Sequence, residues 1–278
     1  MTELGKLNTL EVLRIVEHGS YLASDLGDIL LPTKYMLPDT AIGDEVEVFL
    51  YKDSEDRLIA TNLVPKGMVG EYAVLECKDD NDVGAFMEWG LEKDLMVPHA
   101  EQHRRMRRGE KYVVRICLDP RTERIFGTSR LAAFLRTDQQ EQLSPGSEVN
   151  LLIYETTDLG YMALIDEKYR GILYKNEVFK PLQVGDKLTA FVKKIREDNK
   201  IDLTLEKFGY SKVTDAKSIV WNILLQKGGE MPFSDKSSPE DIKQHFQMSK
   251  GVFKNALGAL FKEQKIKLEP NKVIAIIK

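Results

Sequence analysis

The sequence has few of the residues that mark secreted or metal-binding proteins. Its two cysteines, Cys77 and Cys117, each lie in an apolar, strand-like run without a CxxC or Cys/His companion. They are therefore expected to be reduced core residues. The four histidines have no metal-ligand spacing to cysteines or carboxylates. No metal site is expected.

Long apolar runs and catalytic motifs are also missing. No stretch approaches the roughly 18 to 20 apolar residues of a membrane span. Met1 to Leu10 lacks the basic-then-apolar order of a secretory signal. The sequence contains no Walker loop, no GxSxG motif and no dinucleotide fingerprint. These absences predict a cytoplasmic protein with no membrane association, no cofactor and no catalytic residues, which is not an enzyme.

The net charge is −4, from 40 basic and 44 acidic side chains, whereas the attraction of phosphates needs local positive potential. The charges are distributed unevenly. Residues 1–64 hold 5 basic and 12 acidic side chains, residues 67–138 hold 12 and 13, residues 143–210 hold 10 and 11, and residues 213–278 hold 11 and 7. A nucleic acid is therefore expected to favour the C-terminal half.

What is present is a repeat. Three segments begin at a turn glycine and continue as a strand, a polar hairpin and a second strand. Each is preceded by a long β-prone run and a second strand that starts with glycine. The turn glycines are Gly43, Gly109 and Gly185, and the glycines that start the second strands are Gly19, Gly84 and Gly160.

Each repeat carries five short strands in about 65 residues, and closure into a small barrel protects their edges. The fold class is therefore mainly β with a C-terminal α+β domain: three tandem five-stranded OB-like barrels followed by a winged helix-turn-helix. A polar connector from Thr137 to Gly146 follows the second repeat. The predicted domains are residues 1–64, 67–136, 145–210 and 213–278.

The C-terminal domain is predicted from a change to helical periodicity after Ser211. Ser238 followed by Pro239 opens a second helix, Ser249 caps a third, and Ile266 to Ile277 is typical of a β-hairpin. One face of the first helix is marked by Ala216, Ile219, Val220, Ile223 and Leu224.

The third repeat resembles the S1 RNA-binding domain strand by strand, through Gly171 to Val178, Val184 to Asp186 and Lys200 to Leu205. The order of three such barrels and a winged helix, with Ser129 to Leu135 after the second barrel, resembles the conserved virulence factor B family of bacterial RNA-binding proteins. This resemblance implies a non-enzymatic protein that binds single-stranded RNA on its barrel faces. It also implies a post-transcriptional role in regulating gene expression.

The S1 pattern implies a face with two aromatics on the second strand, a histidine on the third, and an aspartate and an arginine at the last hairpin. The third-strand histidine is replaced by Leu31, Val97 and Tyr174 in the three barrels. The other positions are carried over to His18, Tyr21, Asp53 and Arg57 in the first barrel, to Val83, Phe86, Asp119 and Arg124 in the second, and to Leu159, Met162, Arg196 and Lys200 in the third, with Tyr161 displaced by one.

Two basic clusters add candidate phosphate contacts. They are His103 to Arg108, which includes Arg105 and Arg108, and Lys193 to Arg196. Lys250 and Lys254 lie near the start of the third helix of the C-terminal domain. The predicted RNA-contacting residues are His18, Tyr21, Arg57, Phe86, Arg105, Arg108, Arg124, Tyr161, Tyr174, Lys193, Arg196, Lys200, Lys250 and Lys254.

Alternatives exist for each of these residues. A strand aromatic is often a core residue, a charge run is often a solvated loop, and Trp89 is expected to pack between barrels. The predicted partners are single-stranded RNA and other proteins of RNA metabolism, and DNA is not expected. The alternative function is a DNA-binding regulator or a protein-interaction scaffold acting through the winged helix.

Overall fold

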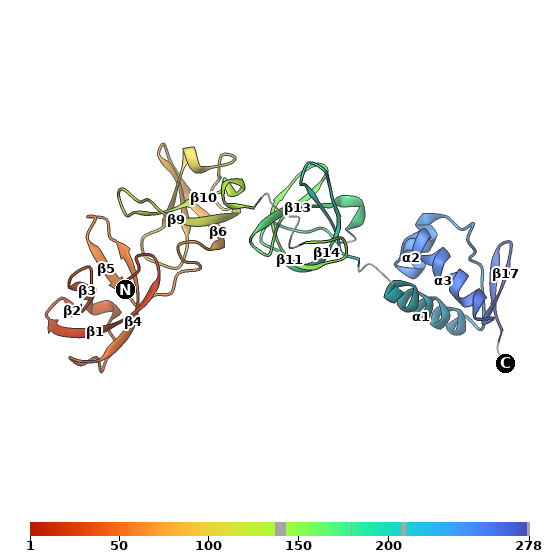
Figure 1. The fold of residues 1–278 in the computed structure, drawn as a ribbon, viewed down its shortest axis with the longest axis horizontal. Helices are drawn as coiled ribbons and strands as arrows, with labels where there is room; N and C mark the ends of the chain where they lie inside the picture. Colours follow the sequence, from red (N-terminus) through yellow and green to blue (C-terminus); the bar gives the residue numbers. More distant parts are fainter. Residues whose placement is uncertain (137–142, 179, 207–209, 277–278) are drawn as a thin grey trace. The chain divides into compact units, whose positions relative to one another are not determined.

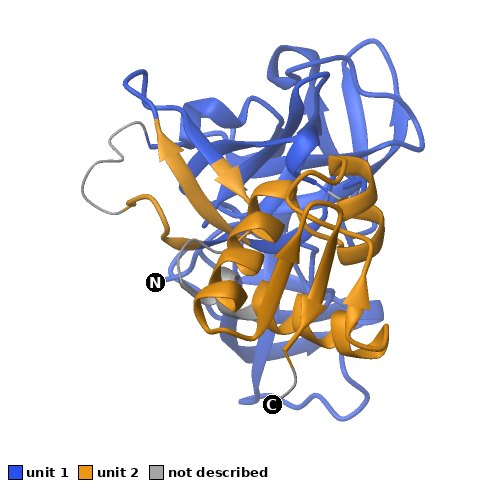
Figure 2. Ribbon diagram, turned by 90° about the vertical axis from the view of Figure 1, so that its right-hand side faces the viewer, with its two compact units in different colours: residues 1–142, 149–189, 196–202 blue, residues 143–148, 190–195, 203–278 orange. Residues whose placement is uncertain are grey.

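The computed structural model describes residues 1–136, 143–178, 180–206 and 210–276, which form three β-barrels and a C-terminal helical domain (Figure 1). The predicted fold class is confirmed. The chain divides into two compact units, residues 1–142, 149–189 and 196–202 in one and residues 143–148, 190–195 and 203–278 in the other (Figure 2). Residues 137–142 of the expected connector lie outside the described residues.

The first barrel is a closed sheet with the order β1-β2-β3-β5-β4. A parallel pairing of Leu30 with Ile59 joins β3 to β5 and completes the closure. Every second residue of a strand faces inward, and inward-facing residues such as Val12, Leu22 and Leu50 are fully buried in the core of this barrel. The elements are β1 (Leu7–Val16), β2 (Gly19–Leu22), β3 (Ile29–Pro32), η1 (Thr33–Tyr35), β4 (Glu45–Lys52) and β5 (Leu58–Thr61).

The second barrel has the strand order β10-β9-β6-β7-β8, and its two outermost strands, β8 and β10, contact each other. Cys77 is buried and free in this core, as expected, whereas Cys117 is free and half-buried. The elements are β6 (Tyr72–Asp80), β7 (Gly84–Glu88), β8 (Leu95–Pro98), η2 (His99–Glu101), β9 (Lys111–Leu118), β10 (Ile125–Thr128) and η3 (Leu131–Phe134).

The third barrel repeats the closed order of the first, β11-β12-β13-β15-β14. Its core holds fully buried residues from several strands, including Ile153, Ala163 and Leu203. The elements are β11 (Glu148–Thr156), β12 (Gly160–Ile165), β13 (Tyr169–Tyr174), η4 (Lys175–Glu177), β14 (Lys187–Ile195) and β15 (Ile201–Thr204).

The C-terminal domain has three helices and a three-stranded sheet of order β16-β18-β17, which is a winged helix-turn-helix. The predicted caps are confirmed, since the Ser238 hydroxyl accepts a hydrogen bond from the Asp241 N–H and the Ser249 hydroxyl accepts one from the Val252 N–H. Ile219 was predicted on the buried face of α1 but is 45% exposed. The elements are α1 (Tyr210–Gln226), β16 (Glu230–Met231), α2 (Pro239–Phe246), α3 (Lys250–Lys262), β17 (Ile266–Glu269) and β18 (Lys272–Ala275).

The hydrophobic core of the second barrel extends onto the first barrel, which also has a core of its own. Phe49 and Tyr51 of β4 belong to the same buried cluster as the residues inside the second barrel. The Trp89 ring meets the Phe49 ring edge-on at 5.8 Å between centroids, and Trp89 is 3% exposed. The predicted packing role of Trp89 between barrels is confirmed.

The second and third barrels also pack directly against each other. Tyr72, Val113 and Leu131 from the second barrel form a buried cluster with Leu152 and Leu164 from the third.

Among the described residues, no helix is long and apolar enough to cross a membrane.

Candidate nucleic-acid interface

Strand register decides which predicted aromatics reach the surface of the third barrel. Met162 pairs with Ile172, and Ile172 is two residues before Tyr174, so these three side chains share one face. All three are half-buried, as expected for the outer face of a barrel wall. Tyr161 pairs with Leu173 and is only 7% exposed, because a displacement of one residue along a strand turns the side chain to the opposite face.

Register also shows that Leu31, Val97 and Tyr174 do not occupy equivalent positions in the three barrels. Tyr174 pairs with Gly160 just as Pro32 pairs with Gly19 and Pro98 with Gly84. The residue equivalent to Leu31 and Val97 is therefore Leu173, and the residues equivalent to Tyr174 are Pro32 and Pro98.

Tyr174 belongs to a polar cluster at the end of the third barrel's last hairpin. Its hydroxyl donates to Asp202 Oδ1 at 3.3 Å and accepts a hydrogen bond from Arg196. Arg196 also donates to Asp202, with Nε at 3.0 Å from Oδ2, and this hydrogen bond raises the pKa of the guanidinium. The cluster fixes a half-buried ring beside a permanent positive charge.

Asp202 belongs to this cluster although it is not among the RNA-contacting residues predicted from the sequence. It lies between the buried residues Ile201 and Leu203 on β15, and that alternation was the available signal that its side chain faces outward. It places a carboxylate beside Arg196 where the S1 pattern has an aspartate and an arginine. Lys193 and Lys200 are both exposed, and Lys200 Nζ pairs with Asp198 at 2.7 Å.

In the first barrel the predicted aromatic pair does come together. The His18 and Tyr21 rings lie edge-on, with centroids 6.3 Å apart. Arg14 Cζ lies 4.1 Å from the Tyr21 centroid and therefore covers one face of that ring. Arg57 is held by Asp53, with Nε 2.9 Å from Oδ2, and by Glu55. The predicted cation here is already ion-paired.

In the second barrel Phe86 and Arg124 line one pocket, of about 440 Å³, together with residues of the first barrel. Arg124 forms a bidentate ion pair with Asp56 of the first barrel, and this pairing lowers the pKa of the Asp56 carboxyl. Val83 is 58% exposed. Arg124 therefore links two barrels, a role that its position in the sequence did not reveal.

The residues of the basic run His103 to Arg108 differ in burial and in ion pairing. Met106 is fully buried in the second-barrel core and anchors the segment. Arg105 pairs with Asp80 at 3.1 Å, whereas Arg108 is exposed. The run is therefore not one continuous basic patch.

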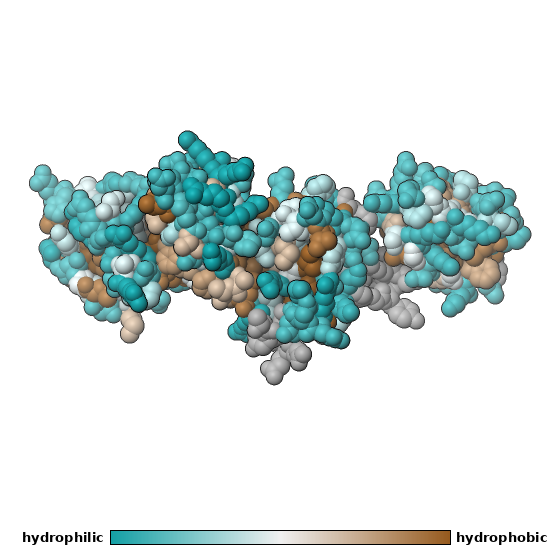
Figure 3. Space-filling model, turned by 90° about the horizontal axis from the view of Figure 1, so that it is seen from above, coloured by the Kyte–Doolittle hydropathy of each residue, from teal (hydrophilic) through white to brown (hydrophobic). Residues whose placement is uncertain are grey.

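In the winged helix Lys250 is half-buried and Lys254 is exposed on α3. Hydrophilic side chains cover most of the face drawn in Figure 3, and the hydrophobic ones there form small groups. Among the described residues, no group of three or more His, Cys, Asp or Glu side chains is placed to hold a metal ion.

Comparison with known proteins agrees with this architecture. Residues 4–63 match the S1 domain family, and residues 219–274 match the CvfB-like winged helix domain. Barrels of this type and helix-turn-helix domains commonly contact nucleic acids, so the two matches indicate nucleic-acid binding.

Relatives match over most of their length. The chain is 31% identical to the uncharacterized protein YitL of Bacillus subtilis (strain 168), over 94% of this chain and 90% of YitL. It is 25% identical to conserved virulence factor B of Staphylococcus epidermidis (strain ATCC 12228 / FDA PCI 1200), over 84% and 81% of the two chains. A crystal structure of a multidomain protein with nucleic acid binding domains from Streptococcus pneumoniae TIGR4 covers 98% of both chains at 23% identity, with a TM-score of 0.44. The chain belongs to the conserved virulence factor B family.

Proposed function

We propose that this chain binds single-stranded RNA in the cytoplasm and acts as a non-enzymatic, post-transcriptional regulator of gene expression. The observation that carries the proposal is the ring of Tyr174, held beside Arg196 on the outer face of the third barrel. An unpaired base can stack on such a ring, while nearby cations attract the phosphates.

Single-stranded RNA is favoured over duplex DNA because α3 presents few positive charges near its N-terminus. A recognition helix reads the major groove with side chains near its N-terminus. There α3 offers only Lys250, which is half-buried, and Lys254, and it contains no arginine. The bidentate guanine contact that arginine makes is therefore not available from this helix.

Tyr174→Ala is expected to weaken binding of labelled oligo-U by about tenfold, since stacking one base on an aromatic ring contributes about 1 to 3 kcal/mol. The measurement is a fluorescence-anisotropy titration of the whole chain with oligo-U, with the matching single-stranded DNA and with duplex DNA, at two salt concentrations.

Tyr174→Phe is the matched control, because it keeps the ring and removes only the hydroxyl bound to Asp202 and Arg196. It should bind oligo-U within about twofold of wild type if stacking is the main interaction. Equal affinity for oligo-U in wild type and Tyr174→Ala would remove the third-barrel face from the proposal. Stronger binding to duplex DNA would favour a regulator that acts through the winged helix.

A further inference from the structure

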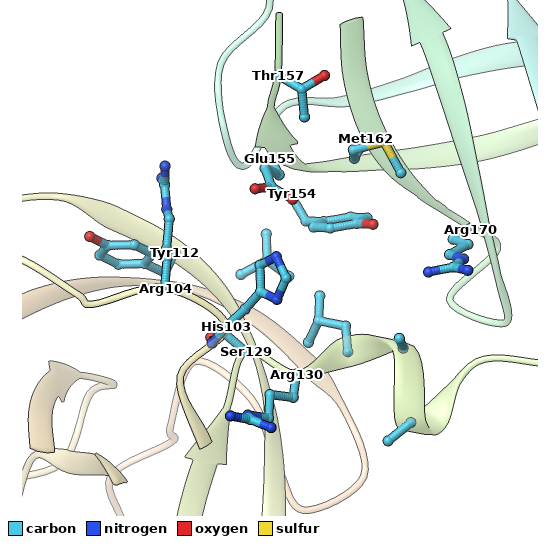
Figure 4. A pocket seen from close by; sticks show the side chains of 14 residues that line it. His103, Arg104, Tyr112, Ser129, Arg130, Tyr154, Glu155, Thr157, Met162 and Arg170 are labelled. Atoms are coloured by element: carbon cyan, nitrogen blue, oxygen red, sulfur yellow. The ribbon is translucent and has the colours of Figure 1, made fainter. Parts of the chain in front are cut away.

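A cleft of about 770 Å³ separates the outer walls of the second and third barrels. Its lining includes His103, Arg104 and Arg130 from the second barrel and Tyr154, Met162 and Arg170 from the third, and Figure 4 shows these side chains around one common space. The volume lies within the roughly 300 to 1,000 Å³ range of ligand sites.

The two walls are held in place by the packing beneath them. Leu131 of η3 lines the cleft and is also buried in the cluster formed with Leu152 and Leu164. Gly185 of the third barrel lies so close to the second that a Cβ atom there would come within 2.7 Å of a Val74 methyl group. The main-chain N–H of Arg136 donates to the Lys168 carbonyl at 2.8 Å. The cleft therefore lies between two barrels that contact each other directly.

The arginines of the cleft form no ion pair with any described residue, whereas most of the cations predicted from the sequence are paired with carboxylates. Arg57, Arg124 and Arg196 each form an ion pair with a carboxylate. Within the described part of the chain, Arg104, Arg130 and Arg170 form none, and all three are exposed. Arg104 instead lies over the Tyr112 ring, 5.6 Å from its centroid.

The charge balance of the lining favours an anion. Three arginines and His103 face one carboxylate, that of Glu155. Guanidinium groups match phosphate oxygens in a bidentate geometry, and each is permanently charged. Three guanidinium groups that form no ion pair with a described residue and share the cleft with one carboxylate favour phosphates as counter-ions.

The cleft is continuous with the face that carries Tyr174. Met162 lines the cleft and lies on the same face of the sheet as Ile172 and Tyr174. Tyr154 lies beside it, half-buried against the cluster between the barrels. Burial raises the pKa of the Tyr154 hydroxyl, which therefore stays protonated and can donate a hydrogen bond.

We infer that the cleft between the second and third barrels is a second RNA-contact site, in which Arg104, Arg130 and Arg170 bind phosphates of a single strand that also crosses the Tyr174 face. This inference rests on the proposed function and extends it. The strand passes from Tyr174 over Met162 into the cleft, so the two barrels bind one ligand jointly.

The test replaces Arg104, Arg130 and Arg170 together by glutamine and measures oligo-U affinity as a function of salt. The affinity constant K falls as salt rises, and each phosphate contact makes the slope of log K against log salt steeper by about 0.7. Loss of three contacts should therefore make the slope less steep by about 2. Affinity at low salt should fall by about tenfold or more. Far-UV circular dichroism checks that the variant remains folded.

The matched control replaces the exposed lysines Lys111, Lys187 and Lys236 by glutamine, which removes the same charge outside the cleft. Its slope should stay close to that of wild type. If both triple variants behave alike while wild type binds oligo-U, the cleft is not a site and the proposed function stands. If wild type does not bind oligo-U, both ideas fail.

Two further measurements distinguish an RNA strand from a free nucleotide as the ligand, and the cleft from the Tyr174 face as the main site. Excess UMP at constant ionic strength is expected to leave the complex intact, and displacement by UMP would identify a nucleotide pocket instead of a strand path. If Tyr174→Ala binds normally while the cleft variant loses affinity, the cleft is the main site and the Tyr174 face is not.

Discussion

Gly84→Ala is expected to lower the free energy of unfolding of the second barrel by about 3 kcal/mol, the upper part of the range for overpacking a tight site. A Cβ atom on Gly84 would lie 2.5 Å from the Val97 carbonyl oxygen and 3.0 Å from the Pro98 Cα. Both neighbours are backbone atoms, and Gly84 pairs with Pro98 across β7 and β8. The two strands must therefore separate to admit a methyl group.

The measurement is denaturant unfolding followed by Trp89 fluorescence in a Trp221→Phe background, since Trp89 and Trp221 are the two tryptophans of the chain. Gly109→Ala is the control in the same barrel, because a Cβ there meets nothing within 4 Å. Its positive φ of 81° should cost about 1 kcal/mol. Equal destabilisation by the two substitutions would show that the close approach at Gly84 is unimportant.

The same contact explains why the repeat could be found in the sequence. Gly19 and Gly160 occupy the equivalent positions in the other two barrels, where a Cβ would lie 2.2 Å from the Leu31 oxygen and 2.3 Å from the Leu173 oxygen. A glycine that sterics require at one point of each barrel leaves a mark in the sequence. The three barrels were predictable because of these glycines. The helix caps and the C-terminal hairpin were predictable because each depends on residues close together in the sequence.

The candidate site was less predictable because it depends on register and on contacts distant in sequence. Tyr161 and Tyr174 are both strand aromatics, and only the pairing with β13 determines that Tyr161 faces inward and Tyr174 outward. Arg124 is ion-paired with Asp56, which is 68 residues away in the chain. No local pattern marks such a partner.

The cleft residues illustrate the same limit. Arg130 and Arg170 stand apart in the sequence and belong to different barrels, so no basic run marks them. Arg104 lies in a basic run, but the structure separates it from Arg105, which pairs with Asp80. Packing between barrels creates the group, and that packing involves apolar residues whose partners cannot be read from spacing.

Phe49→Ala is expected to destabilise the first and second barrels together, by about 3 to 5 kcal/mol, which is the usual cost of removing a buried phenylalanine ring. Phe49 is fully buried and, although it belongs to β4 of the first barrel, it lies in the core cluster of the second. Its ring contacts Trp89 of the second barrel. The cavity left by the substitution therefore opens at the junction of the barrels.

Trp89 fluorescence in the Trp221→Phe background reports this effect directly, since Trp89 belongs to the second barrel while the substitution is in the first. Phe49→Leu is the control, because it keeps most of the buried volume and should cost about half as much or less. An unchanged Trp89 transition in Phe49→Ala would mean that the two cores unfold independently. A lowered one would show that the first barrel, the most acidic of the three, stabilises the second barrel and the cleft wall that it carries.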